Sequence, residues 1–182
     1  MLKIAKELKE SNIAEYLIYM WQVEDLLRAY KLDIELIKKQ VIEPLPKEEE
    51  EKKELIKWYS ELIDMMYLEG IREKGHLQIN KNVIIQLTDL HNRLMAVTKF
   101  PFYNAAYFKA LPFIVELRAK SNNKDQPELE VCFEALYGVM LLRLQKKEVS
   151  KETDEAVQII ANFISMLANF YSKDIVGELK FE

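Results

Sequence analysis

Glu24 is the residue whose position in this sequence most strongly suggests chemistry. At about 100° per residue it falls in the middle of an apolar helical stripe, formed by Ile13, Leu17, Met20 and Leu27. An ionised carboxylate without a partner is strongly disfavoured there, so Glu24 must be paired, protonated or placed at a water-filled cleft. Arg143 interrupts the apolar face of its own predicted helix in the same way. We predict a buried Glu24–Arg143 ion pair, with Arg28, one helical turn away, as the local alternative.

The two histidines and the single cysteine point to structural roles. Glu73 and His76 match one copy of Glu-x-x-His, the pattern that binds metal in di-metal bundles, but the sequence has no second copy. Zinc or iron sites need three or four convergent ligands, so we expect no metal and no cofactor. No carboxylate shares the helical face of His91, which favours a hydrogen-bonded histidine at the core margin over a general base. Cys132 lies mid-helix between leucines and is predicted to pack as a small hydrophobe.

Familiar catalytic loops are missing from the sequence. It has only four glycines, and no pair is closer than Gly70 and Gly75, whereas phosphate-binding and dinucleotide-binding loops need several glycines within a few residues. No serine has the flanking glycines of a hydrolase elbow. We therefore assign no catalytic residue, and the sequence favours a non-enzymatic protein.

Large aromatic side chains surround the helix predicted over residues 101–120, and Pro112 lies inside it. We favour a kinked core helix covered by several neighbours; the alternative is the wall of an apolar pocket. In that alternative, five polar or ionisable side chains would bind the ligand: Glu24, Tyr19, His91, Asn104 and Tyr107.

The last predicted helix carries an outward stripe of four uncharged polar residues: Gln158, Asn162, Ser165 and Asn169. A solvated bundle helix more often carries lysine and glutamate on that face. Because uncharged polar groups cost less to desolvate, we interpret the stripe as a contact surface, in the form of a twofold homodimer. Ordinary solvent exposure is the alternative.

Helices must position all these residues, because apolar residues recur at helical spacing from Ile4 to Tyr171. We predict an all-α, single-domain antiparallel bundle over residues 1–182, with about six long helices and one or two short ones. Residues 173–182 form a tail that either docks or frays. Four residues are predicted N-caps: Asn12, Asp33, Asn80 and Ser150. Gly75 is the predicted stop of the helix that follows Pro46, and residues 121–126 form the clearest loop.

Composition and charge limit the partners. A net charge of -4 argues against binding to nucleic acid. No apolar run approaches the roughly 20 residues of a membrane-spanning helix, and the charged first nine residues lack the apolar centre of a secretory signal. A lone cysteine cannot form an intrachain disulfide, in agreement with a reducing compartment. We expect a cytoplasmic protein whose partner is itself or another cytoplasmic protein.

Two segments carry a resemblance to a known family. Residues 12–25, NIAEYLIYMWQVED, and residues 100–106, FPFYNAA, resemble a small family of bacterial proteins known only as a domain of unknown function. The resemblance spans most of the chain. It implies a compact helical protein without an established activity. We therefore predict a non-enzymatic interaction or self-associating protein; the alternative is a small-molecule-binding protein or unrecognised enzyme with a pocket near Glu24, His91 and the helix over 101–120.

Overall fold

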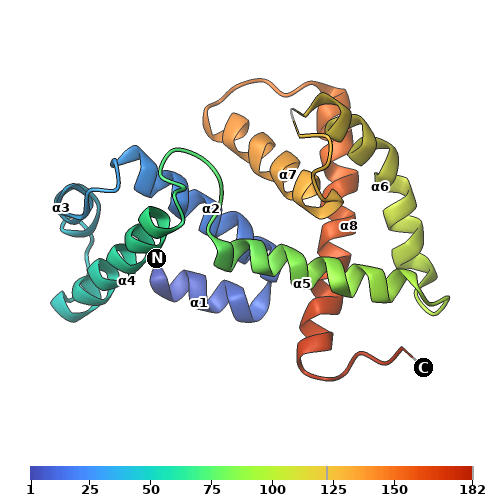
Figure 1. Cartoon of the computed structure of the whole chain (residues 1–182), viewed down its shortest axis with the longest axis horizontal. Coiled ribbons are helices and arrows are strands. Elements are labelled where there is room, and N and C mark those ends of the chain that lie inside the picture. Colours follow the sequence, from blue (N-terminus) through green and yellow to red (C-terminus); the bar gives the residue numbers. More distant parts are fainter. Residues whose placement is uncertain (122, 182) are drawn as a thin grey trace. The chain divides into compact units, whose positions relative to one another are not determined.

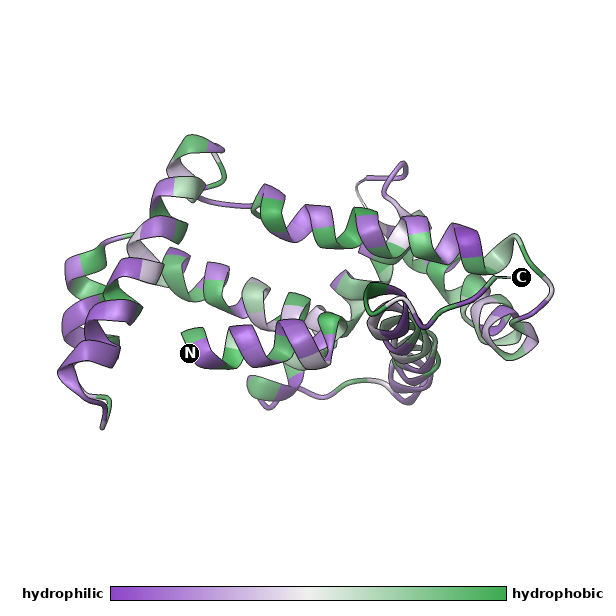
Figure 2. Cartoon of the chain, turned by 90° about the horizontal axis from the view of Figure 1, so that it is seen from below, coloured by the Kyte–Doolittle hydropathy of each residue, from purple (hydrophilic) through white to green (hydrophobic). Residues whose placement is uncertain are grey.

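The chain is all-helical, as predicted. The computed structural model describes residues 1–121 and 123–181, and this part of the chain contains eight α-helices and no strand (Figure 1). The six long helices are α2 (Ile13–Ala29), α4 (Glu49–Leu68), α5 (Gln78–Met95), α6 (Pro101–Lys120), α7 (Glu128–Leu144) and α8 (Lys151–Ile175). The two short ones are α1 (Leu2–Ser11) and α3 (Ile34–Ile37), and a π-helix, η1 (Lys38–Ile42), continues α3. Hydrophilic and hydrophobic residues alternate along the helices, as amphipathic packing requires (Figure 2).

The helices group into two compact units. The first unit comprises residues 1–11 and 15–83, and the second comprises residues 12–14 and 84–182. The boundary between Val83 and Ile84 lies inside α5. The prediction of a single domain over residues 1–182 stays a prediction.

The core of the first unit is built from amphipathic faces that the sequence pattern predicts. On α4, the residues spaced three or four apart are buried: Leu55, Tyr59, Leu62, Ile63 and Met66. Asp33 accepts hydrogen bonds from the backbone amides of Glu35 and Leu36 and so caps α3, as predicted. The predicted stop at Gly75 is wrong. Helix α4 ends at Leu68, and Gly70, with a φ of 69°, takes the left-handed conformation that follows.

In the second unit, α8 packs against α6 and α7. The inward face of α8 is fully buried at Ile160, Phe163 and Leu167, and Ser150 caps the helix through a hydrogen bond from the Thr153 amide. Helix α6 has the predicted bounds, but neighbours do not cover all of its rings. Tyr103 is buried, whereas Phe102 is 83% and Phe108 is 59% exposed.

Two other predictions concern the ends of elements. Helix α5 begins at Gln78, ahead of the predicted cap at Asn80, whose side chain has a different role described below. The predicted loop over 121–126 and the tail over 173–182 each include one residue, 122 and 182, that lies outside the described residues. In the described part of the tail, the ring of Phe181 contacts that of Phe100, with centroids 5.8 Å apart. None of the helices described is long and apolar enough to span a bilayer.

Candidate functional site

Glu24 is fully buried in the first unit, on the α2 face that the sequence assigns to it. Its Oε1 accepts hydrogen bonds from the backbone N–H of Leu77, at 3.0 Å, and from Nδ2 of Asn80, at 2.6 Å. Its Oε2 lies 2.6 Å from Nδ1 of His76. Because a carboxylate can only accept hydrogen bonds, the imidazole donates from Nδ1. The predicted requirement for a partner is therefore met by three groups at the start of α5.

His76 and its loop are held from two further sides. The imidazole ring stacks on the buried indole of Trp21, with centroids 3.9 Å apart and an interplanar angle of 11°. The guanidinium of Arg28 donates to the carbonyls of Ile71, at 3.3 Å, and Gly75. Side chains of α2 thus fix the segment that joins α4 to α5 at several points.

The predicted buried pair between Glu24 and Arg143 is wrong. The Arg143 side chain is 53% exposed and forms its ion pair with Asp154, near the start of α8. The local alternative also fails, because Arg28 pairs with Asp25 at 2.9 Å instead of Glu24. Arg143 lies at the last turn of α7, where an arginine can place its head group in water while its stem covers apolar neighbours.

The Glu24–His76 pair has the geometry by which a carboxylate orients a histidine base. The imidazole side chain is 21% exposed, and Nε2 has no hydrogen-bond partner among the described residues. The neighbours that hold the ring are Glu24 and Trp21. Through these contacts the arrangement joins α2, the loop and α5.

His91 belongs to a separate cluster in the second unit. It is 9% exposed, its Nδ1 lies 2.6 Å from the Tyr103 hydroxyl, and its ring contacts those of Tyr107 and Phe163. Burial lowers the pKa of His91, and the negative charge of Glu128 partly opposes this effect. The histidine is thus a neutral, hydrogen-bonded group, which agrees with the structural role favoured by the sequence.

Tyr107 extends this cluster toward a charged pair. Its hydroxyl donates to Oε2 of Glu128 at 2.8 Å, and Arg118 approaches the other oxygen of Glu128 at 3.4 Å. Burial, with a contribution from Glu128, raises the pKa of Tyr107 to about 12. Cys132 is fully buried, and burial raises the pKa of its thiol. This cysteine is therefore a packing group with little thiolate character.

The predicted ligand-binding residues fall into both units. Tyr107 contacts His91, whereas Tyr19 donates to the Met1 carbonyl at 3.2 Å, in the unit that contains Glu24. Oδ1 of Asn104 is buried without a hydrogen-bond partner in the described part of the chain. The role of these residues in ligand binding stays a prediction. Sequence reasoning missed His76 and Asn80 as partners of Glu24, and Trp21 as the ring that stacks on His76; the glycine before His76 is the one local sign of a tight approach.

Helix α8 presents the predicted outward face. Gln158, Asn162, Ser165 and Asn169 are all exposed, and we call these four residues the α8 stripe. Their spacing of four, three and four residues places them along one line of the helix.

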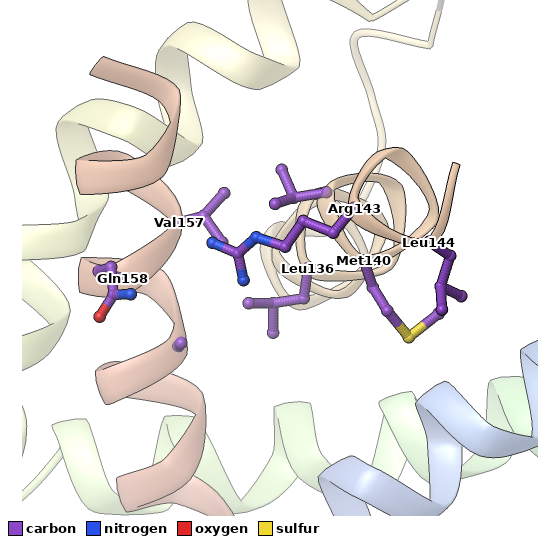
Figure 3. A pocket seen from close by; sticks show the side chains of 8 residues that line it. Leu136, Met140, Arg143, Leu144, Val157 and Gln158 are labelled. Carbon is purple, nitrogen blue, oxygen red and sulfur yellow. The ribbon is translucent and has the colours of Figure 1, made fainter. Parts of the chain in front are cut away.

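A groove between α7 and α8 adjoins the α8 stripe (Figure 3). It has a volume of about 370 Å³ and mostly apolar walls, and Gln158 belongs to both the groove and the stripe. Arg143 extends from α7 toward Val157 of α8 and crosses the groove, while Leu144 at its edge is 68% exposed. This surface of the second unit combines exposed apolar area with uncharged polar groups.

The described residues contain no group of three or more histidine, cysteine, aspartate or glutamate side chains placed to hold a metal ion. In the Glu73–His76 match, Nδ1 of His76 lies within hydrogen-bond distance of Glu24.

Comparison of the sequence with known proteins identifies a family to which the chain belongs. The model of a family described as a domain of unknown function, DUF4924, matches residues 2–178. No curated protein and no solved structure matches the chain. The resemblance carried by residues 12–25 and 100–106 is thereby confirmed, and a bacterial source stays a prediction.

Proposed function

Since this chain belongs to the DUF4924 family, whose function is unknown, we propose from its geometry that it is a non-enzymatic interaction protein that forms a twofold homodimer through α8. The α8 stripe carries the proposal. Its four side chains are exposed, polar and uncharged, on a helix whose opposite face is buried in the second unit. Moving neutral polar groups out of water costs less free energy than moving the lysines and glutamates that are usual on such a face.

The side chains of the α8 stripe can pair with copies of themselves. Asparagine, glutamine and serine each donate and accept hydrogen bonds, so two identical stripes can form reciprocal bonds across a twofold axis. The alternating spacing of the stripe matches the seam along which two helices pack. An axis that crosses α8 between Phe163 and Ile164 sets Gln158 opposite Asn169 and Asn162 opposite Ser165 of the second copy.

The same axis brings opposite charges together at both ends of the seam. Glu155 of one copy then lies one residue away from the position opposite Lys173 of the other, within reach of both long side chains, and the pair occurs twice. Glu155 has only a long contact of 3.9 Å with Lys151, between exposed side chains, and Lys173 has no salt bridge within the described residues. Exposed charges of this kind select register and orientation more than they add affinity.

The groove between α7 and α8 supports a surface larger than one helix face. It shares Gln158 with the α8 stripe, and the exposed Leu144 lies at its edge. Stable interfaces bury about 800 Å² on each partner, so a dimer needs more surface than the four side chains of the stripe. A reducing compartment, and hence a cytoplasmic location, is proposed on the buried free thiol of Cys132.

Sedimentation velocity over a series of micromolar concentrations tests the proposal. The native chain should sediment as a reversible dimer, Glu155→Lys and Lys173→Glu should each shift the equilibrium toward monomer, and the double exchange Glu155→Lys/Lys173→Glu should restore the dimer. Glu134→Lys, an equal charge change on the exposed side of α7, serves as the control. A strictly monomeric mass at every concentration would overturn the homodimer, and a double exchange no better than the single variants would overturn this register.

A further inference from the structure

We propose that a groove in the first unit, between α1 and α4, is a binding site for an alkyl carboxylate, meaning a small molecule with an aliphatic chain and a carboxylate at one end. The groove has a volume of about 280 Å³, just below the range usual for ligand pockets. Residues of α1, α2 and α4 line most of it. The site is distinct from the α8 stripe and does not depend on the proposed homodimer.

The walls of this groove suit an aliphatic chain. Met20 and Leu62 are buried beneath it, Met65 lies beside them, and Trp58 forms part of the wall. Methionine side chains adapt to irregular apolar ligands because they are unbranched and polarizable. A neighbouring depression of about 300 Å³ shares Leu2, Lys6, Trp58 and Glu61 with the groove, and Glu54 and Lys57 complete its lining. The two hollows adjoin along α1 and α4, which leaves room for an elongated ligand.

The positive charges at the groove favour an anionic ligand. Of the six lysines on α1 and α4, four pair with glutamates three or four residues away: Lys3, Lys52, Lys53 and Lys57. The other two, Lys6 and Lys9, both line the groove and have no carboxylate partner among the described residues. They lie three residues apart and therefore on one side of α1. The two lysines without acidic partners are thus the two placed at this apolar groove.

The ammonium group of Lys9 lies near an aromatic ring at the edge of the groove. Its Nζ lies 5.7 Å from the centroid of the Tyr16 ring, which lines the same groove, so an aromatic face and not a carboxylate stabilises the charge. Glu61, the one carboxylate that lines this groove, is within 3.9 Å of Lys57. A ligand carboxylate between Lys6 and Lys9 would receive charge-assisted hydrogen bonds from both ammonium groups.

The positions of the two tryptophans provide a direct test. Trp58 lines the groove, whereas Trp21 is buried under the His76 ring. Titration of the full chain with octanoate should change tryptophan fluorescence and release heat with the same saturation curve. Trp58→Phe should abolish the fluorescence change while calorimetry still detects binding. Octanol and octylamine, which keep the chain and alter the head group, should bind at least about tenfold more weakly, because they lack the anion that the lysines select.

Variants of the lysines test the head-group contact. Lys6→Gln and Lys9→Gln should each weaken octanoate binding about fivefold to tenfold, and Lys53→Gln, which alters an exposed lysine outside the groove, should leave it within about twofold. The side chains of Lys6 and Lys9 are both exposed, and circular dichroism should confirm that each variant is folded. Absence of saturation at millimolar octanoate overturns the site. Equal affinity for octanoate and octanol, or unchanged affinity in both variants, overturns the role of the lysines and with it the proposed ligand class.

Discussion

Glu24 and His76, which are 52 positions apart in the chain, meet in the first unit with Oε2 and Nδ1 at 2.6 Å. This contact, with the hydrogen bonds from Leu77 and Asn80, secures the start of α5 to α2. The carboxyl group also lies at the N-terminal end of α5, where the helix dipole favours negative charge.

Removal of the Glu24 carboxyl group should be costly for folding. Glu24→Ala leaves the Leu77 amide and the Asn80 side chain without their acceptor, and we expect a loss of about 3 to 5 kcal/mol in the free energy of unfolding. Glu24→Gln keeps the shape and one acceptor and should cost less, about 1 to 3 kcal/mol. Urea denaturation followed by circular dichroism measures both. Glu73→Gln is the control, because the carboxylate of Glu73 is exposed and has no salt bridge within the described residues, so its loss should change stability by under about 1 kcal/mol. A loss no larger for Glu24→Ala than for this control would contradict the structural role.

His91 should make stability depend on pH. Burial lowers its pKa in the folded chain below the ordinary 6.5, so between the folded and unfolded values the unfolded chain binds more protons. Stability is then fully present above about pH 6.5 and declines as the pH falls toward the folded pKa. His91→Gln, which retains a hydrogen-bonding group for Tyr103, should flatten this decline. Thermal unfolding of both chains from about pH 7.5 to 5 measures the difference; parallel curves would show that His91 contributes nothing.

The glycines at positions 70 and 138 should respond in opposite ways to alanine. Gly70 has a φ of 69°, which alanine adopts only with strain, so Gly70→Ala should destabilise the chain by about 1 kcal/mol. Gly138 lies inside α7, and a methyl group there would meet no atom within 4 Å. Gly138→Ala should therefore stabilise the chain by about 0.5 to 1 kcal/mol. Shifts of the same sign in the urea midpoints would refute this interpretation.

Cys132 should be nearly inert in the folded chain. Its side chain is fully buried and its thiol pKa is raised by burial, whereas the thiolate is the reactive form. We expect a colorimetric disulfide reagent to label the native protein far more slowly than the protein in urea. A native rate close to that of free glutathione would place the thiol in contact with solvent.

Local pattern predicts much of this fold. The buried face of α4 and the bounds of α6 follow from apolar spacing and from proline, which act within one helix. The burial of Glu24 follows in the same way. The partner of Glu24 could not be predicted in this way, because His76 lies in an irregular segment, where helical periodicity does not indicate which way a side chain points. Arg143 shows the opposite error: its apolar neighbours suggest burial, but it lies at the last turn of α7, where its long side chain reaches Asp154.

The hydrogen bonds from Arg28 to the carbonyls of Ile71 and Gly75 should protect this segment from proteolysis. Between those two carbonyls lie Arg72 and Lys74, both exposed and both residues after which trypsin cleaves. A protease must draw several residues of its substrate into an extended form, and a segment fastened at each end resists that. Cutting at these two sites would therefore report transient release of Arg28, and its rate would measure how often the connection between α4 and α5 opens while the remaining helices stay folded.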